Sequence, residues 1–238
     1  MIKKIEGIVV GEISYQETSK IIKIFTCDGI INVLAKGSKK ITNKNFTATT
    51  YLTYGSFLIY EHDLSILKSA SKKKNYKNIL KDIVKLSASS YIVSLITQVF
   101  KQNKSKELYS FLLSSLNKIN DNINPLAIVN IIEVKLLPYL GLKLNLESCA
   151  LCNNSNITCL SLDYSGFLCS NCSNIKMDKK ILKLIKIYKN IELDKLESIK
   201  LDNSYLLFIN KFLDDYYDKY TGLFLRQKVF FKDMYLKS

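Results

Sequence analysis

The sequence predicts an α+β chain, in which an N-terminal β-barrel of five strands precedes a helical domain with an inserted four-cysteine module. Three observations predict this class: β-rich runs fill residues 1–70, helical periodicity follows, and five of the six cysteines fall within residues 149–172. At 238 residues the chain exceeds the usual size of one domain. We therefore expect two domains, residues 1–78 and 79–238, with the cysteine module at residues 147–175.

The expected barrel consists of short runs rich in Ile, Val, Thr, Tyr and Phe, a composition typical of strands. The runs are residues 4–15, 19–26, 30–36, 50–60 and 64–70. Asp28-Gly29 indicates a tight turn after the second run, and His62-Asp63 a hairpin turn before the fifth. Five strands suit a Greek-key barrel of the OB type, a common nucleic-acid-binding form, although an SH3-like barrel would show the same pattern.

A lysine-rich segment, residues 71–78, is expected to link the barrel to an amphipathic helix at residues 79–100. No signal-peptide core is present at the start, and no apolar run approaches the roughly 20 residues of a membrane span. The sequence therefore predicts a cytosolic protein.

Further helices are expected on both sides of the cysteines. Before the cysteines we expect helices at residues 108–116 and 126–137, with Pro125 in the first turn of the second helix and Pro138 at its end. After the cysteines we expect two more helices, with Asp178 and Asp202 as their N-caps and Gly222 as a C-terminal stop.

The cysteines form two CxxC pairs, Cys149 with Cys152 and Cys169 with Cys172, separated by sixteen residues. Four thiolates on two tight turns are the tetrahedral ligand set that Zn²⁺ favours, and in the cytosol such a cluster binds metal more often than it forms disulfides. Because four sulfurs leave no open position for water, we expect a structural zinc ion. Cys159, within the spacer, and Cys27 are expected to be small buried side chains.

Lysines gather in VLAKGSKKITNKNF, residues 33–46, where a strand end runs into a loop with Lys36, Lys39, Lys40 and Lys44. Ammonium and backbone N–H groups in such a loop can lie along a phosphate chain, so we expect nucleic-acid binding here. The alternative is a solvated connection, and a solvated linker is the expected role of Lys72, Lys73, Lys74 and Lys77.

The charge supports a polyanionic partner, since 35 basic residues against 21 acidic ones give a formal +14. Residues 1–79 carry 13 lysines and six acidic residues and are thus about twice as basic, per residue, as the rest of the chain. The only histidine, His62, has no nucleophile motif near it in the sequence, so we expect no catalytic site.

Taken in order, these features resemble the RecO family of bacterial recombination mediators over nearly the whole chain. The most specific matching segments are ETSKIIKIFT (17–26), DGIINVLAKGSKK (28–40), YLGLKLNLESCALC (139–152) and SLDYSGFLCSNC (161–172). The resemblance implies an N-terminal OB domain, a helical domain with the zinc module, and a non-enzymatic activity. That activity is binding single- and double-stranded DNA, annealing complementary strands and helping to load RecA onto strands coated by single-strand-binding protein.

The resemblance also implies partners and site residues. The implied direct partners are RecR and the acidic C-terminal tail of single-strand-binding protein. RecF and RecA are implied as indirect partners, and the implied location is the nucleoid, within the cytoplasm. Lys36, Lys39 and Lys40 match the family's basic loop, in which arginine is common. The C-terminal segment resembles the family's basic C-terminal segment, which implies that Arg226 also binds nucleic acid. A competing hypothesis is an OB and zinc-ribbon module that binds structured RNA or docks in a translation or transcription assembly. A nuclease or thiol oxidoreductase has the least support.

Overall fold

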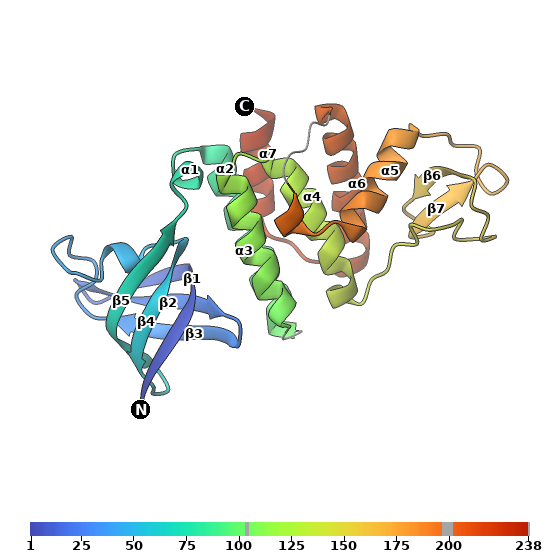
Figure 1. The fold of residues 1–238 in the computed structure, drawn as a ribbon. Helices are drawn as coiled ribbons and strands as arrows, with labels where there is room; N and C mark the ends of the chain where they lie inside the picture. Colours follow the sequence, from blue (N-terminus) through green and yellow to red (C-terminus); the bar gives the residue numbers. More distant parts are fainter. Residues whose placement is uncertain (103–104, 197–201, 238) are drawn as a thin grey trace. The chain divides into compact units, whose positions relative to one another are not determined.

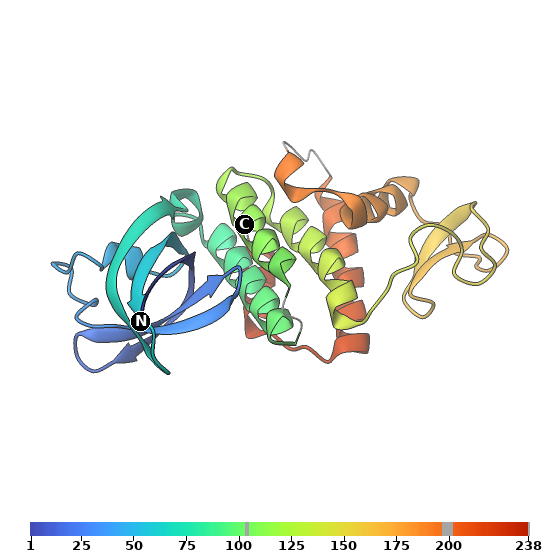
Figure 2. The same ribbon diagram turned by 60° about the horizontal axis from the view of Figure 1, so that its bottom comes forward.

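Five strands form the N-terminal part of the protein (Figure 1). The computed structural model describes residues 1–102, 105–196 and 202–237. The strands are β1 (Ile2–Tyr15), β2 (Ser19–Thr26), β3 (Gly29–Ala35), β4 (Thr53–Tyr60) and β5 (Ser65–Asn75), with a short 3₁₀ turn, η1 (Thr47–Thr49), before β4. In two views the strands curve around a common interior (Figure 1, Figure 2).

The strand order identifies the type of barrel. The hydrogen-bonded order is β1-β2-β3-β5-β4, and the sheet closes because β4 also pairs antiparallel with β1. β3 and β5 pair in parallel, through Val33 with Ser65 and Leu34 with Ile66. A five-stranded Greek-key barrel of this kind is of the OB type, which confirms the predicted fold class and decides against the SH3-like alternative.

The barrel interior is filled by alternate residues of the strands, as the pleat requires. In β4 buried and partly exposed residues alternate from Thr53 to Ile59. The interior cluster consists of Ile5, Val9, Ile22, Ile24, Val33, Ala35, Phe57, Ile59 and Leu67. Complete burial of one such aliphatic or aromatic side chain contributes about 1.5–3 kcal/mol, so this cluster is the main source of barrel stability.

Gly7 in β1 occupies a position where no side chain fits. A Cβ atom at residue 7 would lie 2.5 Å from the carbonyl oxygen of Phe25 and 2.7 Å from Cγ2 of Ile24. We therefore expect Gly7→Ala to lower the free energy of unfolding by about 1–3 kcal/mol, measured by urea unfolding. Gly11→Ala, on the same strand, is the matched control, because its Cβ would meet Lys23 at an ordinary 3.6 Å. Equal losses in the two variants would contradict this explanation.

Helices form most of the remaining chain, with one hairpin, β6 (Ile157–Ser161) and β7 (Gly166–Cys169), inserted between them. The helices are α1 (Lys77–Leu80), α2 (Ile83–Gln102), α3 (Lys106–Asn120), α4 (Pro125–Leu136), α5 (Lys179–Asn190), α6 (Asn203–Thr221) and α7 (Arg226–Leu236). Short 3₁₀ turns, η2 (Leu137–Leu140) and η3 (Leu193–Lys195), complete the described elements.

The predicted helix boundaries are confirmed where a cap or proline signalled them. The carboxylates of Asp178 and Asp202 accept hydrogen bonds from the N–H groups of Lys180 and Ser204, and Gly222 ends α6 in a left-handed conformation. Pro125 is in the first turn of α4, and α4 ends before Pro138.

Two predictions around residue 75 are wrong. Lys72, Lys73 and Lys74 belong to β5 rather than to a linker, because β5 continues to Asn75 in pairing with β4. The helix expected at residues 79–100 is two helices, since the side chain of Asp82 accepts hydrogen bonds from the N–H groups of Val84 and Lys85 and starts α2. α7 was not anticipated as a helix.

Contacts between Cα atoms divide the chain into two units, one with Met1–Lys77 and the first half of α3, the other with the remaining helices and the hairpin. Whether the boundary predicted at residue 78 separates independently folding domains stays a prediction. Contrary to the sequence-based expectation, α2 is long and apolar enough to cross a membrane, with 19 residues at a mean hydropathy of 1.4. However, 56% of that stretch is buried against other parts of the protein, as in a core helix.

Candidate nucleic-acid interface and metal centre

The lysine loop, residues 36–46, connects β3 to η1 and is held against the barrel by its backbone. The N–H of Lys39 donates to the carbonyl of Thr18 at 2.9 Å, and the N–H of Gly37 donates to Oγ of Ser19 at 3.1 Å. Gly37 has a φ of +64°, a value that favours glycine. The loop therefore lies beside the turn between β1 and β2.

Buried polar side chains fix the two ends of this loop. Ser38 is fully buried and donates to the carbonyl of Ala35 at 2.8 Å. Asn45 is also buried, and its side-chain oxygen accepts a 3.0 Å hydrogen bond from the N–H of Ala70 in β5. Because both ends are bonded to strands, the lysines between them are presented from a defined backbone.

The four predicted loop lysines differ in availability. Lys36, Lys40 and Lys44 are exposed, whereas Lys39 is half-buried and donates from Nζ to the carbonyl of Gln16 at 3.0 Å. Among the residues that the structure describes, the other three lysines of the loop have no ion pair, and the ammonium group of Lys39 ties the loop to the neighbouring turn. Arg226, the fifth predicted residue, is exposed at the first position of α7, in the other unit.

The end of β5 adds to the barrel basic residues that were expected in a linker. Lys72 and Lys73 are exposed, and Lys73 forms an ion pair with Glu6 that lowers the pKa of this glutamate. Lys74 lies with its ammonium 5.4 Å from the ring centre of Tyr76. Residues 71–75 are all polar, so this part of β5 lacks the alternation of apolar and polar residues that predicts a strand.

The four cysteines predicted as metal ligands come together in the second unit. The sulfur atoms of Cys149, Cys152, Cys169 and Cys172 all lie within 4.8 Å of one another, and those of Cys152 and Cys169 are 3.5 Å apart. A tetrahedral ion about 2.3 Å from each sulfur would place the sulfurs about 3.8 Å apart. The ligand set therefore fits a four-coordinate metal ion such as zinc.

Two backbone turns orient these sulfurs. In the first, the N–H of Asn153 donates to the carbonyl of Cys149; in the second, the N–H groups of Cys172 and Ser173 donate to the carbonyl of Cys169. The β6–β7 hairpin brings the turns together, as the strand-turn-strand pattern of the spacer predicted.

The sulfurs strongly influence each other's ionisation. Burial alone would raise the pKa of Cys149, but N–H groups of Leu151, Cys152 and Cys169 stabilise its thiolate and bring the pKa down to about 6. The pKa of Cys172 is raised to about 12, because Cys152 and the other nearby sulfurs compete for the same protons and burial adds to the effect. All four sulfurs would be thiolates at neutral pH only with a cation between them.

The remaining cysteines behave differently from each other. Cys159 is buried beside the cluster and, as predicted, is not one of the four ligands. Cys27 is exposed, so the expectation that it is buried is wrong. Cys27 and Asp28 form the tight turn between β2 and β3, and the side chains of such a turn point into solvent.

A buried ion network joins the C-terminal helix to its neighbours. Nζ of Lys228 in α7 lies 2.9 Å from Oε1 of Glu133 in α4 and also pairs with Asp214 in α6. The hydroxyl of Tyr91 donates to the same Glu133 oxygen at 2.6 Å, and that of Tyr217 donates to the Glu133 carbonyl. Burial raises the pKa of Glu133, while the two carboxylates outweigh burial and raise the pKa of Lys228.

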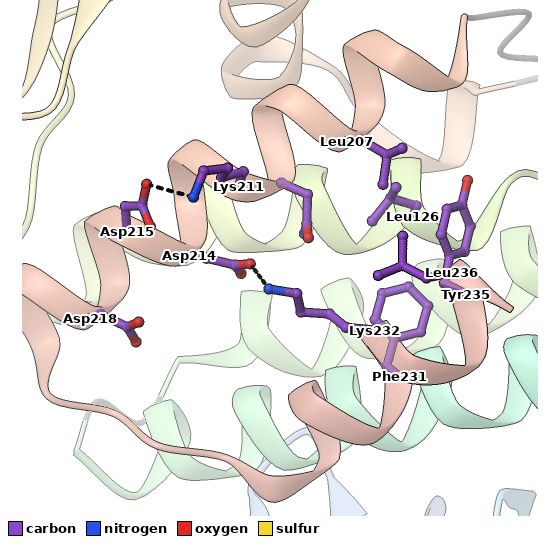
Figure 3. A pocket seen from close by; sticks show the side chains of 11 residues that line it. Leu126, Leu207, Lys211, Asp214, Asp215, Asp218, Phe231, Lys232, Tyr235 and Leu236 are labelled. Carbon is purple, nitrogen blue, oxygen red and sulfur yellow. Dashed lines mark hydrogen bonds and ion pairs between the residues drawn. The ribbon is translucent and has the colours of Figure 1, made fainter.

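A pocket of about 420 Å³ opens next to this network, between α4, α6 and α7 (Figure 3). Leu126, Leu207 and Leu236 line one end, and two ion pairs, Asp214 with Lys232 and Asp215 with Lys211, line the other. An apolar end beside a charged end is typical of a binding pocket for a peptide or small molecule.

Comparison with known proteins agrees with this arrangement along the whole chain. Residues 1–76 match the family model "Recombination protein O N terminal", and residues 80–228 match "Recombination protein O C terminal". The relatives named "DNA repair protein RecO" include that of Listeria monocytogenes serotype 4b, 29% identical over 98% of this chain and 94% of its own length. Those of Shouchella clausii and Bacillus cytotoxicus are 32% and 28% identical over 98% of this chain, covering 95% and 98% of their own lengths.

The family assignment favours the DNA-repair hypothesis over a subunit of a translation or transcription assembly. Two family models that together cover both units, and full-length relatives that share one name, give one assignment. The chain belongs to the RecO family and acts in DNA repair and recombination.

Proposed function

We propose that the protein binds single- and double-stranded DNA through its lysine loop, anneals complementary strands, and helps to load RecA onto strands coated by single-strand-binding protein. The observation that carries the proposal is the position of Lys36, Lys40 and Lys44, exposed on a loop bonded to the β1–β2 turn. In OB barrels the loop between the first two strands and the face of strands 2 and 3 contact oligonucleotides.

The mechanism requires no covalent step. Ammonium groups replace the counterions of the phosphates, which lowers the repulsion between two strands and raises their local concentration, so that complementary bases pair. Lysine is a point charge without the planar fork of arginine, and we therefore expect contacts to phosphates that are independent of base sequence.

The zinc ion we propose for the four cysteines would have a structural role. Bound there, it would cross-link the two cysteine turns without an open coordination position. Cys149, Cys152, Cys169 and Cys172 would hold it, and the surrounding residues fold around it.

Annealing of complementary oligonucleotides tests the proposed function. We expect the triple variant Lys36→Ala, Lys40→Ala, Lys44→Ala to anneal roughly tenfold or more slowly than wild type, because three phosphate contacts are lost. The matched control replaces three exposed lysines elsewhere, Lys101, Lys211 and Lys237, with the same change in net charge. Lys39→Ala alone should have a smaller effect, since its ammonium already binds the Gln16 carbonyl. Equal rates in the triple variant and its control would contradict the proposal.

The partners are proposed from family membership. We expect RecR and the acidic tail of single-strand-binding protein to bind directly, RecF and RecA to act indirectly, and the protein to localise with the nucleoid. A pull-down with RecR, and with single-strand-binding protein with and without its tail, checks the direct contacts. Loss of binding on removal of the tail is the expected result.

A further inference from the structure

Helix α5 carries a concentrated positive charge on the side that does not pack. Residues 176–189 contain six lysines and one aspartate, a net charge of +5 out of +14 for the whole chain. The opposite side of the helix is core, formed by Ile181, Leu182, Leu184, Ile185 and Tyr188.

Four of these lysines form one row. Lys176, Lys179, Lys180 and Lys183 are all exposed. Lys179, Lys180 and Lys183 lie three and four residues apart on one face of the first turns of α5, and Lys176 lies in the irregular segment just before the helix. We call these four residues the α5 lysine row. At about 1.5 Å per residue the helical part of the row, Lys179 to Lys183, rises about 6 Å, and Lys176 precedes it, so the four ammonium groups can reach neighbouring phosphates of one strand.

The fold itself gives little reason for this row. Like charges at these spacings destabilise a helix, and cations are unfavourable near its N-terminus. Lys186 and Lys189, further along α5, do have a structural partner, with Nζ atoms 2.6 and 3.6 Å from the carboxylate of Glu147. Within the described ranges, Lys176, Lys179 and Lys183 form no such ion pair. Lys180 lies 6.0 Å from the ring centre of Tyr205.

We propose that the α5 lysine row binds the phosphate backbone of a second nucleic-acid strand. The inference rests on the proposed annealing function, in which one protein must hold two strands, whereas the lysine loop accounts for one. Asp178, the one acidic residue within the row, caps α5 and accepts a hydrogen bond from the hydroxyl of Tyr205, so the row keeps a net positive charge. Such a row of point charges matches a polyphosphate, which requires no apolar anchor. A tightly bound peptide, in contrast, depends on a buried anchor residue.

Binding of a short non-complementary oligonucleotide of thymidines to the full-length, zinc-loaded protein tests this inference. The row variant carries Lys176→Gln, Lys179→Gln, Lys180→Gln and Lys183→Gln. The scattered control carries the same substitution at four other exposed lysines, Lys81, Lys101, Lys195 and Lys237. Zinc content and the urea unfolding midpoint are measured for both variants to verify folding.

We expect wild type and the scattered control to bind two oligonucleotides per chain and the row variant one. The row variant should anneal complementary strands roughly tenfold more slowly than wild type. The slope of its log binding constant against log salt concentration, taken over all bound oligonucleotides, should be less steep than that of wild type by up to about 3. The loop variant, Lys36→Ala, Lys40→Ala, Lys44→Ala, should also bind one oligonucleotide per chain, at the α5 lysine row.

Two results would overturn the inference while leaving the proposed function intact. One is a row variant that binds two oligonucleotides and anneals at the rate of the scattered control. The other is a row variant with unchanged DNA binding that loses binding of a glutamate-rich peptide, which would assign the row to an acidic protein partner. Failure of wild type to bind DNA at all would instead refute the proposed function, and this inference with it.

Discussion

Replacing Cys169 and Cys172 with serine is expected to abolish binding of one equivalent of zinc and to unfold the segment from about Cys149 to Met177. The free energy of zinc binding to four-ligand sites in small modules is about 10–16 kcal/mol. Complete burial of one apolar side chain contributes only about 1.5–3 kcal/mol. Metal analysis of the purified protein measures the first effect, and limited proteolysis of the segment measures the second.

The expected unfolding follows from the composition of the module's core. Its buried cluster is Cys149, Cys159, Leu168 and Cys169, so three of four members are cysteines and two are metal ligands. Without the ion the sulfurs would be joined by no metal bond and would contribute little apolar area. A four-residue strand, β7, and its partner β6 are too short to be stable alone.

Two single variants provide the controls. Cys27→Ser should retain the full equivalent of zinc, because Cys27 is exposed and lies in the barrel unit. Cys159→Ala should also retain it, although loss of a buried side chain lowers stability. A zinc-free Cys159 variant, or a double variant that keeps its zinc, would contradict the assignment of ligands.

Lys228→Ala is expected to lower the free energy of unfolding by about 3–5 kcal/mol, because it removes one member of a buried ion network. Glu133 has no solvent-exposed surface, and its second carboxylate oxygen, Oε2, already lacks a hydrogen-bond partner among the described residues. Without Lys228 the buried carboxylates lose their shared cation. Phe231 is the one fully buried side chain of α7, so loss of the Lys228 ion pairs should loosen the packing of this helix against its neighbours. Urea unfolding and hydrogen exchange of residues 226–236 measure the two effects.

The pH dependence of this loss distinguishes charge from packing. Burial raises the pKa of Glu133 above its ordinary value, and removal of Lys228 should raise it further. The folded state of the variant then binds a proton more tightly than the unfolded state, so its stability relative to wild type increases as pH falls through the raised pKa of Glu133 toward the ordinary pKa of a glutamate. A loss that is independent of pH would indicate lost packing of the lysine side chain. Lys211→Ala is the matched control, because its pair with Asp215 is exposed and should contribute little.

Much of the fold could be predicted because local patterns determine it. Alternating apolar residues marked β2 and β4, the aspartate N-caps marked the starts of α5 and α6, and the CxxC spacing marked the metal ligands. Each of these signals lies within a few residues in the sequence. The sulfurs converge because the spacer forms the expected hairpin.

The rest depends on contacts between distant residues. Lys228 and Glu133 are far apart in the sequence, and neither residue alone indicates that a lysine in a polar C-terminal helix would pair with a fully buried glutamate. Lys72 to Lys74 have the composition of a linker and become a strand only through pairing with β4. The engagement of Lys39 by the Gln16 carbonyl likewise requires the β1–β2 turn to be in place.

The salt dependence of single-stranded DNA affinity tests the central claim, that loop lysines bind phosphates, most directly. With Lys36, Lys40 and Lys44 as contacts, log K should fall with log salt at a slope of about −2 from the loop, approaching −3 if Lys39 also participates. Substituting the three exposed lysines with alanine should reduce the observed slope by about 2, while the control at Lys101, Lys211 and Lys237 leaves it unchanged. An equal slope in wild type and the loop variant would contradict the account.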